Sequence, residues 1–252
     1  MEETVMALGP SYRVPYRRRR EGKTDYQARR ALVLSRVPRF VVRGSLKHIT
    51  VQITEAQPNG DRIITSAYSR ELIKTYGWQA NCGNMPSAYL TGFLCGLRAV
   101  SKDIKKSILD IGLFSPTKGS RIFAALKGAL DAGVEIPCDK EKLPNEKQIS
   151  GQLIAEYAQQ LSANEQETYH KQFSQYLKEK LQPEQLQEHF SQTKEKIVES
   201  FKPPEERKKE PESKAKPKEK PSAKAAKPKA KAAKTKIARK PRKKKIVEKK
   251  KA

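Results

Sequence analysis

Alternation of apolar and polar residues predicts a β-meander in the first part of the chain. Arg39–Arg43 is short and rich in strand-forming residues, and His48–Thr54 then alternates as a half-buried strand does. Pro58–Asp61 is a strong turn sequence, and Arg62–Ala67 has the composition of a returning strand. Because the loops between these segments are short, we expect three antiparallel strands in chain order.

Helical spacing follows the meander. Ser69–Trp78 predicts one or two helical turns that end at Gly77, and a longer helix runs from about residue 86 to residue 100. Gly92 and Gly96 lie four residues apart on one face of the longer helix. Glycines at this spacing allow a close approach, so we expect this helix to pack tightly on the sheet.

A further strand and a further helix complete the predicted core. Ile108–Leu113 is an apolar strand, Ser120–Asp131 is an amphipathic helix, and Gly133 fits the position just after its C-terminal cap. A helix, a strand and a helix after a meander predict an α/β fold of the α+β type, with helices packed on a mixed sheet.

The next part of the chain has apolar residues at helical spacing in narrow seams. The seams comprise Ile149, Leu153, Ile154, Tyr157 and Leu161, then Phe173, Tyr176, Leu177 and Leu181, then Leu186, Phe190, Ile197 and Val198 in a helix that begins at Pro183. Narrow seams are typical of helices that bury one side only. We therefore expect a helical appendage that packs on the core or on a neighbouring molecule.

Positive charge is concentrated at the two ends of the chain. The 252 residues carry a formal net charge of +25. The segment Lys202–Ala252 holds 23 lysines and arginines against 6 glutamates, a net +17. It has too few apolar residues to offset the entropy of ordering, so we expect it to be disordered in isolation. A basic balance of this size indicates a nucleic acid or an anionic membrane as partner.

These changes in composition divide the chain into four expected parts. They are a basic arm with a short helix over residues 1–36, a mixed-sheet core over 37–137, a helical appendage over 138–201 and a disordered Lys-rich tail over 202–252.

Other features exclude several classes of protein. The chain has no run of eighteen apolar residues and no signal-peptide core, which predicts a cytoplasmic protein without membrane contact. Cys82, Cys95 and Cys138 are an odd number at spacings unlike those of metal sites, so we expect neither disulfides nor zinc. Cys95 lies in an apolar helical pattern and is predicted to be a buried free thiol.

The segment Ser11–Arg36 carries the strongest candidate chemistry. It holds nine arginines and lysines against Glu21 and Asp25. Its run Arg17–Arg20 has no apolar face and repels itself, which predicts an extended, mobile arm in isolation. Arginine makes planar contacts with phosphate and tyrosine can stack on bases, and this segment interleaves the two residue types. A solvated basic tail is the alternative interpretation.

A short helix is predicted at the end of this arm. Thr24 as N-cap with Gln27 three residues later is a capping box. The helix would run from Asp25 to about residue 34 with Arg29 and Arg30 on its polar side. Its apolar side would be formed by Ala28, Ala31 and Leu32, facing the core.

The same segment resembles a known family. The residues that carry the resemblance are Gly9-Pro10, Tyr12, Val14-Pro15 and the contiguous run from Arg17 to Tyr26. They resemble the N-terminal signature of the large-subunit ribosomal protein family that carries 5S ribosomal RNA, universal protein eighteen, in its archaeal and eukaryotic form. The resemblance covers roughly residues 8–201 and is nearer to the archaeal form, in which chains tend to begin as at Met6. The tail departs from that form.

The resemblance implies a fold and a set of partners. It implies a ribonuclease-H-like core, which agrees with the predicted order of elements. It also implies a structural ribosomal protein that binds 5S ribosomal RNA, helps to dock it into the central protuberance of the large subunit, and contacts large-subunit ribosomal RNA and neighbouring ribosomal proteins. An RNA-binding module or chaperone that acts outside the ribosome is the alternative.

The loop before the predicted helix at residue 120 is a second candidate site. Backbone amides at a helix N-terminus, together with Lys118 and Arg121, suit a phosphate of RNA. A plain turn is the alternative. The loop does not match the nucleotide-binding P-loop pattern, because it lacks the first glycine. Residues 116–119 with Arg121 match a motif that recurs in the resembled family, which favours the RNA hypothesis and adds Thr117.

The first hairpin is a third candidate site. Arg43, Ser45, Lys47 and His48 converge at one turn, and a similar basic segment faces RNA in the resembled family. His48 as an exposed residue at the start of a strand is the alternative. Trp78, the single tryptophan, belongs to a stretch that also resembles the family, and a buried anchor is its simplest interpretation.

Catalysis is not supported by the sequence. Two-metal phosphoryl chemistry needs several converging carboxylates, whereas the first strand has none and Asp110 stands alone on the later strand. We therefore expect no enzyme, no cofactor, no metal and no homo-oligomer. The predicted RNA-binding residues are Tyr12, Arg13, Tyr16, Arg17, Arg18, Arg19, Arg20, Lys23, Thr24, Tyr26, Arg29, Arg30, Arg43, Ser45, Lys47, His48, Thr117, Lys118 and Arg121.

Overall fold

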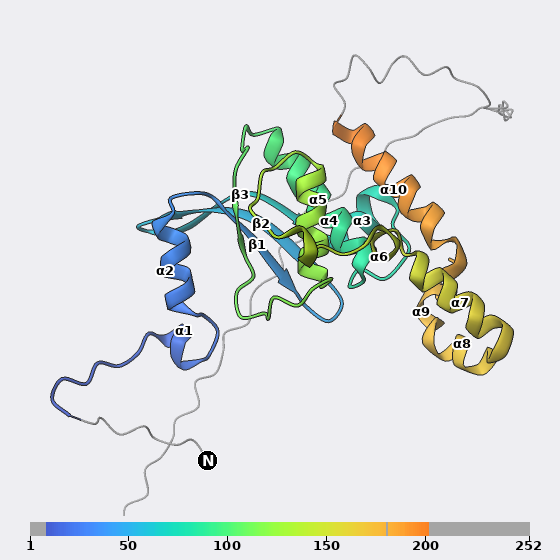
Figure 1. The fold of residues 1–252 in the computed structure, drawn as a ribbon, viewed down its shortest axis with the longest axis horizontal. Helices are drawn as coiled ribbons and strands as arrows, with labels where there is room; N and C mark the ends of the chain where they lie inside the picture. Colours follow the sequence, from blue (N-terminus) through green and yellow to red (C-terminus); the bar gives the residue numbers. More distant parts are fainter. Residues whose placement is uncertain (1–8, 180, 202–252) are drawn as a thin grey trace, which may run out of the picture. The chain divides into compact units, whose positions relative to one another are not determined.

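The computed structural model of the protein describes residues 9–179 and 181–201. Within them the sheet has four strands, and Figure 1 shows their arrangement. The strands are β1 (Arg39–Gly44), β2 (Ile49–Gln57), β3 (Gly60–Tyr68) and β4 (Ile108–Asp110). Their order is β3-β2-β1-β4, with β1 antiparallel to β2, β2 antiparallel to β3, and β4 parallel to β1. The predicted mixed sheet is confirmed. The Lys-rich tail and Met6 lie outside the described residues.

Helices precede, interrupt and follow the sheet. They are α1 (Arg17–Arg20), α2 (Tyr26–Leu34), α3 (Ser69–Tyr76), α4 (Met85–Val100), α5 (Arg121–Asp131), α6 (Glu146–Ser150), α7 (Gln152–Asn164), α8 (Gln166–Gln172), α9 (Ser174–Lys178) and α10 (Leu186–Phe201), with short 3-10 turns η1 (Lys140–Lys142) and η2 (Pro183–Gln185). None of the described helices is long and apolar enough to cross a membrane.

One face of the sheet forms the core. Phe40 pairs in register with Ile53, and Val42 pairs with Val51. All four side chains are at most 1% exposed. Helix α4 packs against β2 and β3, and α5 packs against β1. The alternation of buried and more exposed residues from Phe40 to Val42 and from Ile49 to Ile53 is therefore explained by this covered face, as the period of two predicts.

The glycines of α4 serve a different contact from the one we expected. A Cβ at Gly92 would collide with the carbonyl oxygen of Ala125 on α5, and a Cβ at Gly128 would collide with that of Tyr89 on α4. Gly96 lies in the same way against Ala132. The expectation that these glycines pack on the sheet is wrong, because α5 covers α4 on that side and the two helix backbones touch.

Strand β4 is shorter than predicted. We expected a strand to Leu113, but it ends at Asp110. Gly112 adopts φ +67°, and its N–H donates to Oδ1 of Asp110 at 2.9 Å. This tight turn, which glycine adopts without strain, diverts the chain away from the sheet.

The C-terminal helices share the core with the sheet. Side chains from α6, α7, α9 and α10 belong to the same buried cluster as Phe40 and Val42. One expected seam is correct at Ile149, Ile154 and Leu161, which are buried or packed on the core, but wrong at Leu153 and Tyr157, which are 45% and 44% exposed. The cause is Gly151, whose φ of +83° separates α6 from α7 and shifts the helical phase between them.

Trp78 is the anchor of the last helix. It is fully buried, which confirms the anchor interpretation. Its ring stacks on the ring of His189 of α10, with centroids 5.0 Å apart and planes at 20°. Nε2 of His189 accepts a hydrogen bond from the N–H of Gln79 at 3.0 Å. Because an accepting nitrogen carries no proton, this contact requires the neutral imidazole. Burial, with a contribution from Lys196, lowers the pKa of His189 from its usual value of 6.5.

The glycine contact gives a stability prediction. Gly92→Ala places a methyl group in the backbone of α5, so we expect the free energy of unfolding to fall by about 3 kcal/mol. Gly44→Ala is the matched control, since its methyl group would meet only one Arg121 atom, at 4.0 Å. Chemical denaturation followed by circular dichroism measures both. Equal stability of the two variants would contradict this packing.

The Trp78–His189 contact gives a pH prediction. Because the pKa of His189 is lowered in the folded state, the unfolded state takes up the proton first as the pH falls. Stability is therefore present above pH 6.5 and is lost as the pH falls through the folded pKa. We expect His189→Gln to reduce the fall in melting temperature between pH 7 and pH 5. His170→Gln, which changes an exposed histidine of α8, should leave that fall unchanged.

Candidate RNA interface

The arginine run of the arm forms one helical turn. We expected Arg17–Arg20 to be extended, but it is α1, which contains no buried residue. Glu21 explains the difference, since its carboxylate lies 2.7 Å from Nε of Arg17 and 2.9 Å from Nζ of Lys23. The hydrogen bonds from Arg17 and then Lys23 lower the pKa of Glu21 below its usual value. One carboxylate placed four residues after an arginine offsets part of the repulsion along the turn.

The aromatic side chains of the arm lie at the surface. Tyr12 is 38% exposed and Tyr16 is 74% exposed. The ring of Tyr16 lies 5.3 Å from that of Tyr26, which begins α2. Nε of Arg18 donates to Oγ1 of Thr24 at 2.8 Å. The arm is therefore linked to the start of α2 by one ring contact and one hydrogen bond.

The cap of α2 differs from the predicted one. Asp25, not Thr24, is the N-cap, and its Oδ1 accepts from the N–H groups of Gln27 at 2.9 Å and Ala28 at 3.3 Å. A carboxylate at this position satisfies two free amides and also interacts favourably with the helix dipole. The hydroxyl group of Thr24 instead accepts a hydrogen bond from Nε of Arg18.

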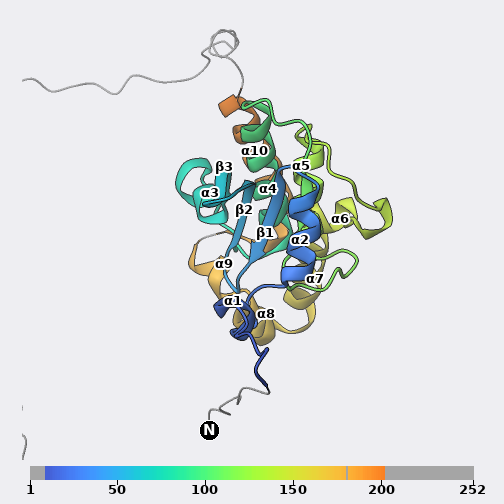
Figure 2. The same ribbon diagram turned by 90° about the vertical axis from the view of Figure 1, so that its left-hand side faces the viewer.

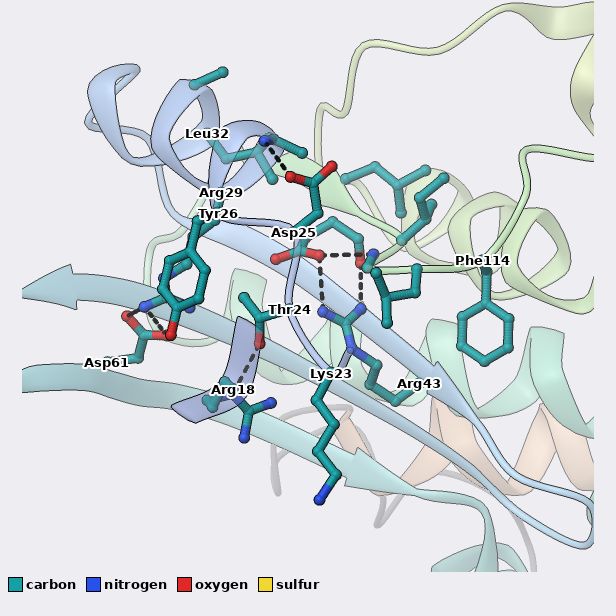
Figure 3. A pocket seen from close by; sticks show the side chains of 17 residues that line it. Arg18, Lys23, Thr24, Asp25, Tyr26, Arg29, Leu32, Arg43, Asp61 and Phe114 are labelled. Atoms are coloured by element: carbon teal, nitrogen blue, oxygen red, sulfur yellow. Dashed lines mark hydrogen bonds and ion pairs between the residues drawn. The ribbon is translucent and has the colours of Figure 1, made fainter. Parts of the chain in front are cut away.

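Helix α2 does not pack on the core. It contains no buried residue, and the expectation that Ala28 and Ala31 face the core is wrong, because both are exposed. Leu32 is partly buried, whereas Leu34 is 70% exposed. Ala28, Ala31 and Leu32 line a groove of about 960 Å³ between α2 and the segment after β4, shown in Figure 3. Phe114, 42% exposed, lies on the opposite wall.

A chain of ion pairs forms the floor of this groove. Nη2 of Arg29 lies 2.8 and 2.9 Å from the two carboxylate oxygens of Asp61. Asp61 also lies 2.7 Å from Arg39, which in turn lies 3.1 Å from Asp110. Arg43 closes the chain with Nη2 at 2.8 Å from Oδ1 of Asp110. Figure 3 shows Arg29 and Arg43, the two ends of this chain, with Asp61 beside Arg29.

Burial and pairing compete at Asp61. Partial burial opposes its ionisation, but the nearby guanidinium groups of Arg39 and Arg29 outweigh this effect and lower the pKa of Asp61 below its usual value. Asp110 binds two arginines and the Gly112 amide. Within residues 9–179 and 181–201, no three His, Cys, Asp or Glu side chains are placed to hold a metal ion.

The first hairpin holds two of its predicted residues in internal contacts. Oγ of Ser45 accepts from the His48 N–H at 3.0 Å and donates to the His48 carbonyl at 2.9 Å, which closes the turn. The ring of His48 is half-buried against Tyr68, with centroids 5.1 Å apart. Lys47 is exposed at the tip of the turn, next to Leu46 with 95% exposure.

The loop before α5 joins this hairpin through Arg121. Its Nη1 donates to the carbonyl of Gly83 at 2.9 Å and to that of Ser45 at 3.3 Å. Arg121 therefore holds the loop and the hairpin together. Thr117 and Lys118 are exposed, and Lys118 makes a solvent-facing ion pair with Glu141 at 3.3 Å.

The structure thus divides the predicted residues into two groups. The first group projects into solvent or makes only exposed contacts, and comprises Tyr12, Arg13, Tyr16, Arg17, Arg18, Arg19, Arg20, Lys23, Arg30, Lys47, Thr117 and Lys118. The second group is engaged with the protein itself, and comprises Thr24, Tyr26, Arg29, Arg43, Ser45, His48 and Arg121. Sequence reasoning missed Asp61 and Arg39. The only available signal was the alternation that places Arg39 and Arg43 on the same face of β1.

Comparison with known proteins identifies the family of the chain. Residues 10–106 and 101–139 match the model of a family described as ribosomal large subunit proteins 60S L5 and 50S L18. A protein from Aeropyrum pernix named large ribosomal subunit protein uL18 is 51% identical over 197 residues, which cover 78% of this chain and 92% of that protein. The chain belongs to this ribosomal protein family.

A second relative extends the same result. The protein of the same name from Staphylothermus marinus is 49% identical over 197 residues, which cover 78% of this chain and 98% of that protein. Similarity to both relatives extends over a longer stretch than the match to the family model. The matched residues 10–139 include the arm, the whole sheet, the first hairpin and the loop before α5.

The ion pairs of the groove give a stability prediction. Asp110 is 7% exposed and pairs with two guanidinium groups, so Asp110→Asn leaves the buried Arg39 with Asp61 as its one carboxylate and removes the ion pair of Arg43. We expect the free energy of unfolding to fall by about 3 kcal/mol. Asp139→Asn removes an exposed carboxylate paired with Lys142 and should change little. Urea denaturation compares the two, and a stable Asp110→Asn variant would show that this network is dispensable.

Proposed function

We propose that this protein is a constituent of the large ribosomal subunit that binds 5S ribosomal RNA and helps to dock it into the central protuberance. The observation that carries the proposal is the arm: four consecutive arginines and two exposed tyrosines, Tyr12 and Tyr16, on a segment without a buried residue. Such a segment gives nothing to the core, so its composition is explained by a partner. Membership of the ribosomal family supports RNA as that partner.

The chemistry of the arm suits structured RNA. Guanidinium groups bind phosphate through two parallel hydrogen bonds, and exposed tyrosine rings stack on unpaired bases. We assign direct RNA contact to the arm, to Arg30, and to Lys47, Thr117 and Lys118, whose side chains are exposed. Arg43, Ser45, His48 and Arg121 support the same surface by fixing the hairpin and the loop.

The rest of the chain has proposed partners of a different kind. The expected partners are large-subunit ribosomal RNA and neighbouring ribosomal proteins. The part over residues 138–201 has an exposed apolar pair, Leu153 and Tyr157, on α7. A helix with a single charged residue, Glu156, is poorly suited to RNA, so we assign this face to a protein neighbour.

The arm tests the proposal. Replacing Arg17–Arg20 with alanine should leave the fold intact, because no core contact is lost. We expect affinity for 5S ribosomal RNA to fall about 10- to 100-fold near physiological salt, with a flatter salt dependence as phosphate contacts disappear. Gel-shift titration against 5S ribosomal RNA and an unrelated RNA of equal length measures both affinity and preference.

A matched control separates specific from general attraction. Replacing Arg242–Lys245 with alanine removes four positive charges from the tail. This control should weaken binding to both RNAs alike and leave the preference for 5S ribosomal RNA unchanged. If the arm variant kept the preference for 5S ribosomal RNA while the tail variant lost it, the arm would not determine the specificity of binding.

A further inference from the structure

Helix α2 is attached to the sheet through a single side chain. Within the described chain, its hydrogen bonds to the sheet come from Arg29, which reaches Asp61 at the start of β3. The helix buries no residue of its own, and Ala28 and Ala31 leave the groove beside it open. Figure 1 shows α2 apart from α4 and α5, and Figure 2, turned by 90°, shows α2 on the side of the molecule that faces the viewer. Packing therefore contributes little to its position.

The acceptor of this contact is rigidly held. Asp61 also pairs with Arg39, whose side chain is only 3% exposed. Arg39 is fixed in turn by Asp110, which binds Arg43 and the Gly112 amide. A carboxylate fixed by a buried guanidinium can hold Arg29 in one orientation at a smaller entropic cost than a free side chain can.

The position of α2 determines the position of the arginine run. Arg18 donates to Thr24, and Tyr16 contacts Tyr26, so α1 is linked to the first turn of α2. Asp25 caps α2 directly after this link. Fixing α2 against Asp61 therefore also orients Arg17–Arg20 relative to the sheet.

We propose that Asp61 is a positioning residue for RNA recognition, which holds the arm in its binding orientation through Arg29. The proposal rests on the proposed binding of 5S ribosomal RNA. It assigns Arg29 a role different from that of Arg30: Arg29 acts through Asp61, whereas Arg30 is free on the exposed side of the helix. Asp61 is thus a negative charge that raises affinity for a polyanion.

The sign of this effect makes it testable. An acidic residue beside an RNA-binding surface repels phosphate, so its removal should raise affinity or leave it unchanged if only long-range electrostatics act. A positioning residue predicts the opposite. Apparent affinity falls in proportion to the fraction of molecules whose arm is correctly placed, so Asp61→Asn should weaken 5S ribosomal RNA binding about three- to tenfold.

The experiment uses the full chain and two matched pairs of variants. Asp61→Asn is compared with Glu55→Gln, which removes an equal charge from an exposed position on the same hairpin. Arg29→Gln is compared with Arg30→Gln, which removes an equal charge from the adjacent residue of α2. Arg29→Gln leaves the Asp61–Arg39 pair intact, so it tests the contact even if Asp61→Asn destabilises the sheet.

Two measurements are made on each variant. Hydrogen exchange in the free protein should be faster in α2 by at least about threefold for Asp61→Asn and Arg29→Gln, and unchanged for both controls. Gel-shift titration should show a similar loss of affinity for Asp61→Asn and Arg29→Gln, with no further loss in the double variant. Glu55→Gln should bind as tightly as the wild type or more tightly.

The outcomes separate this proposal from the one it rests on. A wild type without preference for 5S ribosomal RNA would overturn the proposed function, whatever happens to α2. A wild type with that preference, and an Asp61→Asn variant of equal or higher affinity, would overturn the positioning role alone. Additive losses in the double variant would show instead that Arg29 contacts the RNA directly.

Discussion

A guanidinium group removed from water must be neutralised, and the open face of the sheet is organised around this constraint at Arg39. Two carboxylates meet the requirement, Asp61 from the start of β3 and Asp110 from the end of β4. Each carboxylate also pairs with a second arginine: Asp61 with Arg29 of α2, and Asp110 with Arg43 of β1. The meander, the parallel strand and the arm helix are thus joined on the face that the core leaves uncovered. Replacing one member changes the charge balance of the whole set.

The two faces of the sheet are stabilised by different physics. On the covered face, apolar side chains alternate along β1 and β2, and α4 and α5 approach until their backbones touch through Gly92 and Gly128. That contact is governed by shape and tolerates almost no added volume. On the open face, charged pairs with partial exposure hold a helix that buries nothing. The core is therefore tightly packed, whereas the open face, where we propose that RNA binds, is held by ion pairs that salt can weaken.

Periodicity predicted the meander, the two long core helices and the mixed sheet, because each buries one face and thereby imposes a regular pattern. It failed where a single residue changed the phase or the partner. Gly151 shifted the seam of α7, and Asp25 replaced Thr24 as the cap of α2. The arm was predicted to contact RNA from its charge and aromatic content, and this stays a prediction. The ion pair between Arg29 and Asp61 could not be predicted, because a pairing between residues 29 and 61 leaves no local signal in one sequence.

The contact between Trp78 and His189 also has a spectroscopic consequence. Trp78 is the single tryptophan, it lies against α10, and its ring stacks on an imidazole that can quench indole emission when protonated. Intrinsic fluorescence excited selectively at the indole therefore reports on the docking of the last helix. Attachment of the C-terminal helix can in this way be followed at a single residue, without any introduced label.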